Sequence, residues 1–341
     1  MAGWLERAWY GNKSPLAPLR PVEWLYMRIA RQRRVDHASG DRPVYRAPVP
    51  VVVVGNISVG GVGKTPFVLW LLALLRSQGY RPGIISRGYG AKAPCYPFDV
   101  GPGSAAAEVG DEPLMLVRRS GCPLVIDPVR GRAAAHLLKL HDCDIIISDD
   151  GLQHYALARD LEVAIIDAQR GLGNRRCLPV GPLREPPSRL VEVDYVVVNG
   201  EAPSAGVDGF EVAASHRMLL QPGVLRSLDG SEADLPPQRV HAVAGIGNPQ
   251  RFFATLTQLG YEVVPHPFPD HHTFRAQDLG FGDSLPLLMT EKDAVKCRAF
   301  ASHNRYYLPV DAVLSQAFAD DLLGRINRLV ETYKDFRKAD G

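Results

Sequence analysis

The sequence predicts an α/β protein whose main unit is a mostly parallel sheet with helices on both faces. Short apolar runs rich in β-branched residues alternate with helical runs, as in 49–54 followed by 67–75. Such runs suit strands that are buried on both faces, and alternating strands and helices join through right-handed crossovers. The pattern pauses after Gly200 and resumes near Val240, which indicates a second, smaller C-terminal α/β domain.

Length and composition limit the classes of protein to consider. A chain of 341 residues, 46% hydrophobic and 22% charged, is large enough for two domains with separate cores. Its five cysteines are scattered and form no CxxC pair, so neither a zinc site nor a disulfide framework is indicated, and a reducing cytosol is the simplest setting. No stretch approaches the roughly 20 apolar residues that span a bilayer. The N-terminus also lacks the order of a cleaved signal.

The first 34 residues combine positive charge with aromatic side chains. They hold seven Lys/Arg and two acids, whereas the whole chain carries only +2. A helix beginning at Pro21 places Val22, Leu25, Tyr26 and Ile29 on one face. Tryptophan and tyrosine favour the lipid headgroup region and cations favour anionic lipid, so we expect contact with a membrane surface. A helix packed on the protein's own surface is the alternative, and nucleic-acid binding has less support because no recognised fold accompanies the charge.

A glycine-rich loop follows the first apolar strand and leads into the helix at 67–75. Its glycines allow backbone N–H groups to approach a polyphosphate, and the helix N-terminus adds a partial positive charge. Lys64 can reach the terminal phosphates, Thr65 can hold Mg²⁺, and Pro66 suits the first helical turn. The residues that we expect to bind nucleotide phosphates are Ser58, Val59, Gly60, Gly61, Val62, Gly63, Lys64 and Thr65.

One position departs from the usual P-loop pattern, because Ser58 stands where the first glycine is expected. An ordinary glycine-rich turn is therefore an alternative interpretation. The flanking strand and helix favour nucleotide binding and a fold of the P-loop NTPase type.

Charged residues follow the next strands in turn. Arg87 comes after the strand at 82–86, and Arg130 and Arg132 come after the strand at 123–126. Open α/β sheets bind ligands at the carboxyl ends of their strands, so these arginines are candidates for phosphate contact, with a surface arginine equally expected for Arg87. Asp111 and Glu112 begin a helix, where acids often serve as caps, although a carboxylate pair near a nucleotide also suits a base and a metal ligand.

The apolar run 143–148 ends in Asp149 and Asp150, which resembles a Walker B strand. That arrangement places a carboxylate beside the P-loop to hold Mg²⁺. Gln153 and His154 either hydrogen-bond within the following loop or reach a substrate. Further strands are expected at 161–167 and 194–199; Asn174 lies in the loop after the first, and Asn199, which ends the second, is a candidate adenine contact.

The remainder of the chain suggests a connection and a second lobe. Residues 210–220 and 224–228 predict a two-stranded ribbon, followed by a polar linker, and strand–helix–strand patterns begin at Val240. The loop at 266–274 is rich in histidine and aspartate but lacks the spacing of a zinc site. The predicted divisions are a membrane-associating segment at 1–34, a P-loop core at 35–208, a ribbon and linker at 209–238, and a C-terminal lobe at 239–341.

Eight stretches together resemble one family, the tetraacyldisaccharide 4′-kinases of lipid A biosynthesis. They occur in order from the P-loop to near the C-terminus and include Ser58 as a family feature. The basic aromatic N-terminus is also similar to the family's membrane-associated first segment. The matching stretches are VGNISVGGVGKTP (54–66), SRGYG (86–90), VGDEP (109–113), SDDGLQH (148–154), RGLGN (170–174), GPLRE (181–185), FPDHHTF (268–274) and TEKDAVK (290–296).

The resemblance implies an ATP- and Mg²⁺-dependent kinase at the cytoplasmic face of a Gram-negative inner membrane. It would phosphorylate the 4′-hydroxyl of a tetraacyldisaccharide 1-phosphate to give lipid IVA for lipopolysaccharide, with no nucleic-acid or protein partner. It implies that Asp111 is the catalytic base, paired with His271, and that Lys64 and Thr65 bind phosphate and metal. Asp149, Asp150 and Glu112 would lie near the metal. Apart from the resemblance, position in the loops makes Arg87, Arg130, Arg132, Gln153, His154 and Asn174 the candidate substrate contacts.

Two other functions fit part of the sequence. A soluble P-loop ATPase or GTPase switch explains the GKT and SDD motifs, but it gives no role to the N-terminal aromatic segment or the PDHH loop, and no NKxD motif supports a GTPase. A noncatalytic nucleotide-binding scaffold at the membrane would not need Asp111 or His271.

Overall fold

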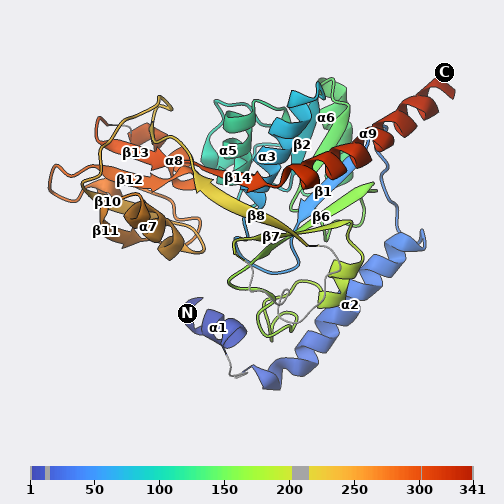
Figure 1. Cartoon of the computed structure of the whole chain (residues 1–341). Coiled ribbons are helices and arrows are strands. Elements are labelled where there is room, and N and C mark those ends of the chain that lie inside the picture. The colour runs from blue at the N-terminus through green and yellow to red at the C-terminus, as the bar shows by residue number, and fades with distance from the viewer. Residues whose placement is uncertain (1, 12–15, 202–214, 301, 340–341) are drawn as a thin grey trace.

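The computed structural model of the chain describes residues 2–11, 16–201, 215–300 and 302–339 (Figure 1). It confirms the predicted α/β fold with a large sheet, flanking helices and a second, smaller sheet. The larger sheet has the strand order β14-β8-β7-β6-β1-β5-β2-β4-β3, and all neighbours are parallel except at its two ends. Its strands are β1 (Val51–Gly55), β2 (Pro82–Ser86), β3 (Phe98–Asp99), β4 (Leu124–Ile126), β5 (Ile145–Asp149), β6 (Leu161–Asp167), β7 (Tyr195–Asn199), β8 (Ser215–Pro222) and β14 (Val310–Leu314).

Both faces of β1 are buried, as its unbroken valine run predicts. Val52 and Val54 face a core formed with α3 (Lys64–Ser77), α5 (Asp111–Ser120) and α9 (Gln316–Ala339). Val51 and Val53 face a second core under α6 (Arg130–Leu140). The central strand is therefore fixed from both sides, which gives the loop that follows it a rigid base.

The smaller lobe has its own five-stranded sheet, in the order β11-β10-β12-β13-β9. Its helices pack on this sheet around a separate apolar core (Figure 1). Its elements are β9 (Arg226–Ser227), β10 (Arg239–Ala244), α7 (Pro249–Gln258), β11 (Glu262–Pro267), β12 (Leu287–Thr290), α8 (Glu291–Cys297) and β13 (Arg305–Leu308).

A two-stranded connection joins the lobes, but its partners differ from those predicted. β8 pairs antiparallel with β14, from Pro222 opposite Val310 to Met218 opposite Leu314, whereas β9 pairs with β13 of the smaller sheet. Local sequence favoured pairing between neighbours, but the partner of β8 comes from a segment almost 90 positions later in the chain. Residues 210–214 of the expected ribbon lie outside the described part of the chain.

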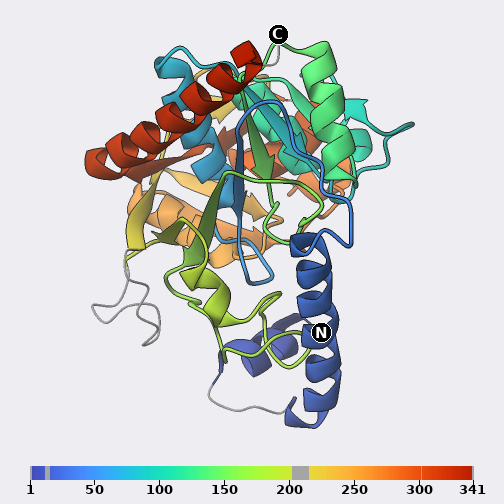
Figure 2. The same cartoon turned by 90° about the vertical axis from the view of Figure 1, so that its right-hand side faces the viewer.

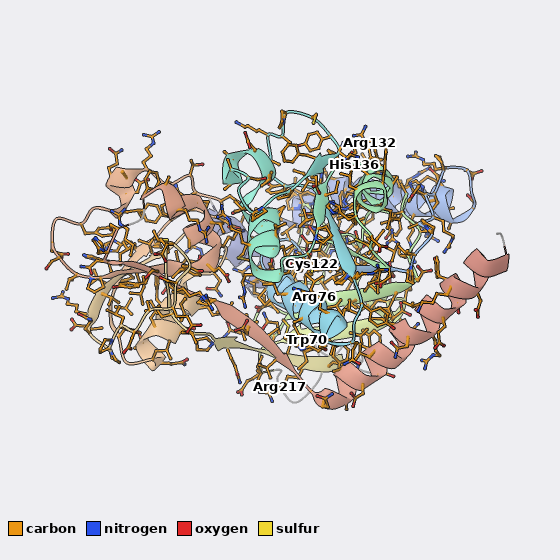
Figure 3. All side chains as sticks on the ribbon, turned by 90° about the horizontal axis from the view of Figure 1, so that it is seen from above. Trp70, Arg76, Cys122, Arg132, His136 and Arg217 are labelled. Carbon is orange, nitrogen blue, oxygen red and sulfur yellow. The ribbon has the colours of Figure 1, made fainter. Side chains whose placement is uncertain are left out.

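The last helix also differs from the predicted division at 239–341. α9 runs across the larger sheet (Figure 1), where its Phe318 is buried beside Phe67 and stacks on Trp70 of α3, with ring centroids 5.7 Å apart (Figure 3). Leu322, Ile326 and Val330 continue this apolar face. The C-terminal helix therefore belongs to the core of the larger lobe, because its hydrophobic stripe is buried there.

Two helices come from the N-terminal segment, α1 (Ala2–Tyr10) and α2 (Arg20–Ala38), and both lie below the larger sheet in the views of Figures 1 and 2. Lys13, one of the basic residues counted in this segment, lies outside the described residues. No helix within the described ranges has the length and apolar character needed to cross a membrane.

Candidate active site

The glycine-rich loop lies between β1 and α3, where the sequence predicts a phosphate site. Gly60 and Gly63 have φ angles of +100° and +93°, and Gly63 is the N-cap of α3. Residues with a Cβ rarely adopt this left-handed region, so both positions require glycine. The loop therefore leads directly into a helix N-terminus, where backbone N–H groups and the helix dipole favour an anion.

Neighbouring loops hold the P-loop from outside. The Val59 amide donates to the Pro182 carbonyl at 2.8 Å, and the Arg184 amide donates to the Ile57 carbonyl at 2.6 Å. The Gln153 side chain donates to the Asn56 carbonyl at 3.1 Å. These bonds fix the first half of the loop before any ligand binds, which lowers the entropic cost of binding.

Lys64 points toward acidic residues at the end of β5. Its Nζ lies 3.4 Å from Asp150 Oδ1 and donates to Asn56 Oδ1 at 3.2 Å. Arg184 also contacts the Asp150 carboxylate, at 3.1 Å. Burial raises the pKa of Asp150, but the charges of Lys64 and Arg184 outweigh it and bring the pKa down to about 2. Asp150 is therefore ionised and holds the lysine beside the loop.

Asp149 ends β5. It lies opposite Val54 on the neighbouring strand β1, which leads into the P-loop. Its carboxyl group is buried, and burial raises its pKa to about 7, with Glu112 and Asp150 adding to the rise. Crowded carboxylates of this kind favour a cation that relieves their repulsion. Thr65 is the second residue of α3, the helix that follows β1 and the P-loop.

These groups fit a magnesium ion bound together with a nucleotide. Within the described ranges, no group of three or more His, Cys, Asp or Glu side chains is placed to hold a metal by itself. Magnesium at phosphate-transfer sites is usually held by one or two carboxylates together with substrate phosphates. Asp149 and one neighbouring carboxylate would therefore be enough protein ligands for a magnesium ion that also binds the phosphates.

The two lobes meet at a carboxylate–imidazole pair. Asp111, at the start of α5, is 7% exposed, and its Oδ2 lies 3.2 Å from Nδ1 of His271 in the smaller lobe. Burial raises the pKa of Asp111, but the hydrogen bond with His271 and the charge of Lys292 outweigh it, so this pKa lies below its usual value. The same bond raises the pKa of His271. A carboxylate with a partner that fixes its orientation is thus present at the junction of the lobes.

Lys292 adds a cation to this junction. Its Nζ lies 3.0 Å from Glu112 Oε1, 3.4 Å from Asp270 Oδ1 and 3.9 Å from Asp111 Oδ2. Burial lowers the pKa of Lys292, but Glu112 and Asp111 outweigh it, so the amine stays protonated. The amine therefore attaches α8 of the smaller lobe to the N-terminus of α5.

Comparison with known proteins identifies this arrangement. The profile of the family described as "LpxK: Tetraacyldisaccharide-1-P 4'-kinase" matches residues 16–327. The chain belongs to this LpxK family. Proteins named tetraacyldisaccharide 4'-kinase from Pseudomonas aeruginosa LESB58 and Ectopseudomonas mendocina are 55% and 54% identical to it. These alignments cover 95% and 96% of this chain and 97% of each relative.

A solved structure of an LpxK supports the fold. The crystal structure of "apo" form LpxK from Aquifex aeolicus in complex with ATP matches with a TM-score of 0.76 at 28% identity, covering 92% of this chain and 99% of that one. The LpxK assignment thus rests on sequence over nearly the full length and on the fold.

The predicted substrate residues of this LpxK member fall into two groups. Arg87 is exposed. Its positive charge adds to the effect of burial in lowering the pKa of Arg130 and the pKa of His154. Arg130 itself is buried and donates to the Asp149 carbonyl at 2.6 Å, so it supports the end of β5. Arg87 and His154 thus lie near the carboxylates of Asp149 and Asp150, on the side of β2 and β5.

The side chains of the other three predicted substrate residues form hydrogen bonds within the protein. Arg132 lies on α6, well away from the smaller lobe (Figure 3), and donates to the buried Asp127 at 2.8 Å. Asn174 donates to the Val180 carbonyl at 2.9 Å, and Gln153 bonds to Glu185 at 2.7 Å as well as to the P-loop. The structure therefore does not bring Arg132 or Asn174 to the acidic site.

Sequence reasoning gave no role to Asn56 or Glu185 and a different role to Asn199, although all three support this site. Asn56 positions Lys64, and buried Glu185 positions Gln153. Asn199 is buried and donates to the Val62 carbonyl at 2.9 Å, so its amide holds the P-loop, whereas the sequence suggests an adenine contact. The VGN and GPLRE motifs contain two of these residues, but only the fold shows what they contact.

His154 predicts a pH dependence of stability. Burial, with Arg130 and Arg87, lowers its pKa to about 3, so the folded chain keeps it neutral while the unfolded chain takes up a proton below about pH 6.5. Its contribution to stability is complete above that pH and is lost as pH falls toward 3. We expect His154→Gln to show a smaller decrease in Tm than the unsubstituted chain between about pH 6.5 and about pH 4. His303→Gln, at an exposed position, is the control; an equal decrease in all three proteins would contradict the expectation.

Proposed function

We propose that this LpxK-family kinase transfers the γ-phosphoryl group of ATP to the 4′-hydroxyl of a tetraacyldisaccharide 1-phosphate, giving lipid IVA. The observation that carries the proposal is the ionised Asp111, held by His271 from the other lobe, together with a P-loop whose lysine is already oriented. A sugar hydroxyl is a poor nucleophile and needs a positioned base, whereas ATP hydrolysis in a switch protein needs no such group for a second substrate.

Residues of the chain accept the proton and stabilise the phosphate charge in this transfer. The hydroxyl oxygen attacks phosphorus, the bond from phosphorus to the β–γ bridging oxygen breaks, and ADP leaves. Asp111 accepts the hydroxyl proton, and His271 keeps the carboxylate oriented. Lys64 and the amides of 60–65 stabilise charge on the phosphate oxygens. Asp149, with Asp150, Glu112 and Thr65 as further candidates, would hold a magnesium ion, which would supply additional charge stabilisation.

The N-terminal helices support attachment to the cytoplasmic face of the inner membrane. α2 binds the larger lobe through polar groups: Cys177 N donates to the buried Glu23 at 2.8 Å, and the Tyr26 hydroxyl donates to the Arg184 carbonyl at 2.9 Å. Val22, Leu25 and Ile29 are 50 to 52% exposed instead. A helix that docks by its polar face and presents its apolar face suits a lipid surface, where the substrate's acyl chains also lie.

Removing this apolar face should weaken membrane binding. We expect the triple variant Val22→Ser, Leu25→Ser and Ile29→Ser to bind vesicles of zwitterionic and anionic phospholipid about tenfold or more weakly, because three side chains no longer enter the interface. Vesicle flotation measures this directly. Leu140→Ser, at a similarly exposed position on α6, is the control; flotation of the triple variant equal to that of the control would rule out this face as the membrane contact.

The decisive experiment uses γ-labelled ATP, Mg²⁺ and purified tetraacyldisaccharide 1-phosphate in detergent micelles. Label appearing in the lipid supports the proposed function. ATP hydrolysis without labelled lipid would favour a soluble ATPase instead.

A further inference from the structure

Two arginines cross between the lobes on either side of the P-loop, and neither has a role in the mechanism above. Arg251 reaches from α7 of the smaller lobe toward the larger lobe, and Arg170 reaches from the loop after β6 in the opposite direction. We refer to these two residues as the clasp arginines.

Arg251 acts on the second half of the P-loop through Asn199. Its guanidinium lies 3.3 Å from Asn199 Oδ1 and 3.5 Å from Asp167 Oδ2. The Asn199 amide nitrogen in turn donates to the Val62 carbonyl, and a Cβ added to Gly63 would overlap it. Two consecutive hydrogen bonds therefore connect α7 to Val62, beside Gly63.

Arg170 acts on the first half. Its Nη2 donates to the carbonyl of Gly247 at 3.0 Å, directly before the N-cap of α7, and a Cβ added to Gly60 would lie 3.1 Å from its Nη1. A Cβ on Gly247 would lie 3.7 Å from the Gly61 nitrogen, so the smaller lobe approaches the loop itself. Arg170 thus lies between the lobe and the loop.

Both clasp arginines also converge on one carboxylate. The Arg170 backbone N–H donates to Asp167 Oδ1 at 3.0 Å, while Arg251 lies beside Oδ2 of the same side chain. Asp167 ends β6, the strand next to β1, and is 7% exposed. The contacts therefore connect α7, the end of the central sheet and the loop segment 60–63 as one unit.

We propose that Arg170 and Arg251 are positioning residues through which the smaller lobe, when it rests against the larger one, sets the P-loop in its ATP-binding conformation. The conformation of Gly60 and Gly63 determines where the loop's N–H groups point; Arg170 lies beside Gly60, and Arg251 reaches the Gly63 end through Asn199. Because coupling between two binding events is reciprocal, ATP on the loop would equally favour the approach of His271 to Asp111. This inference rests on the proposed kinase function only for the identity of the nucleotide.

The test compares Arg251→Ala and Arg170→Ala with the unsubstituted chain. We expect each variant to bind ATP about 5- to 150-fold more weakly, with a higher KM for ATP and a KM for the lipid that changes much less. Arg251→Lys, which keeps the charge but lacks the fork that spans Asn199 and Asp167, should be intermediate. Arg239→Ala is the matched control, since Arg239 lies on the same lobe and pairs with Glu262 at the surface.

A second measurement distinguishes positioning from a general loss of stability. Hydrogen exchange of the amides at 57–64 should rise in Arg251→Ala without ATP, while that of β12 stays as in the Arg239→Ala control. Arg251→Ala should add little to the loss of ATP affinity in an Asn199→Ala background, because both act on the same path.

The outcomes separate this inference from the proposed function. Unchanged ATP affinity in both alanine variants, or fully additive effects of Arg251→Ala and Asn199→Ala, would overturn it, whether or not the lipid is phosphorylated. Weaker ATP binding in both variants, in a protein that fails to label the lipid, would retain the clasp and remove the proposed substrate.

Discussion

Asp111→Ala is expected to lower kcat for lipid phosphorylation by about 10²- to 10⁴-fold, the usual contribution of a general base. The carboxylate is buried at the start of α5, is ionised because its pKa lies below the usual value, and is bonded to His271. The proton of the attacking hydroxyl then has no acceptor. Steady-state kinetics with γ-labelled ATP in micelles measure the loss, and ATP affinity should change far less, because the Asp111 carboxylate pairs with His271, Lys292 and Lys296 of the smaller lobe.

Two variants qualify this expectation. Asp111→Asn retains the shape and a hydrogen bond to His271, so a loss similar to that of Asp111→Ala would indicate that the negative charge is what matters. His271→Ala should cost less than Asp111→Ala, because it removes the partner that orients the base but leaves the base itself. Near-normal turnover in Asp111→Ala would contradict the base assignment and favour the noncatalytic scaffold.

Lys64→Ala is the second change with a large expected effect, a loss of about 10²- to 10³-fold in kcat. Its amine is held by Asn56 and Asp150 in the position where it can meet the terminal phosphates. Without it, the partly exposed Asp150 also loses one of the three cations that keep its pKa near 2, so phosphate binding loses a positive charge and faces a less compensated carboxylate. Single-turnover measurements separate the slower transfer from weaker ATP binding. Lys139→Ala, an exposed lysine on α6, is the control, and equal rates for the two variants would exclude this role.

The sequence was most informative where local pattern and function coincide. The strand, glycine loop and helix around Lys64 can be predicted from residue order alone, because each part depends on its neighbours along the chain. The pair of Asp111 and His271 came only from the family resemblance, since 160 residues separate them. No periodicity predicts that β8 pairs with β14, or that Asn199 holds Val62, because both contacts depend on how the whole sheet is ordered.

The same dependence on the whole fold explains why the sequence did not distinguish among the predicted substrate residues. Arg87, Arg130 and Arg132 all follow strands, so the sequence treats them alike, but burial and partners separate them. Arg130 is buried and supports the Asp149 carbonyl, whereas Arg87 and Arg132 are exposed and Arg132 is paired with Asp127. Position at a strand end therefore predicts proximity to the ligand edge, and not contact with a ligand.

The pairing of β8 with β14 has a consequence for how the smaller lobe is built into the chain. Pro222 and Val310 are register partners, and the Gly223 amide donates to the Pro309 carbonyl at 2.9 Å. The chain leaves the larger sheet and returns to it at the same place, so residues 224–308 form an insertion at the tip of a β-hairpin. A short turn from Gly223 to Pro309 would close that hairpin and leave the nine-stranded sheet and α9 intact. The part of the chain that carries His271 and Arg251 is therefore an inserted domain, and the nucleotide-binding domain is topologically complete without it.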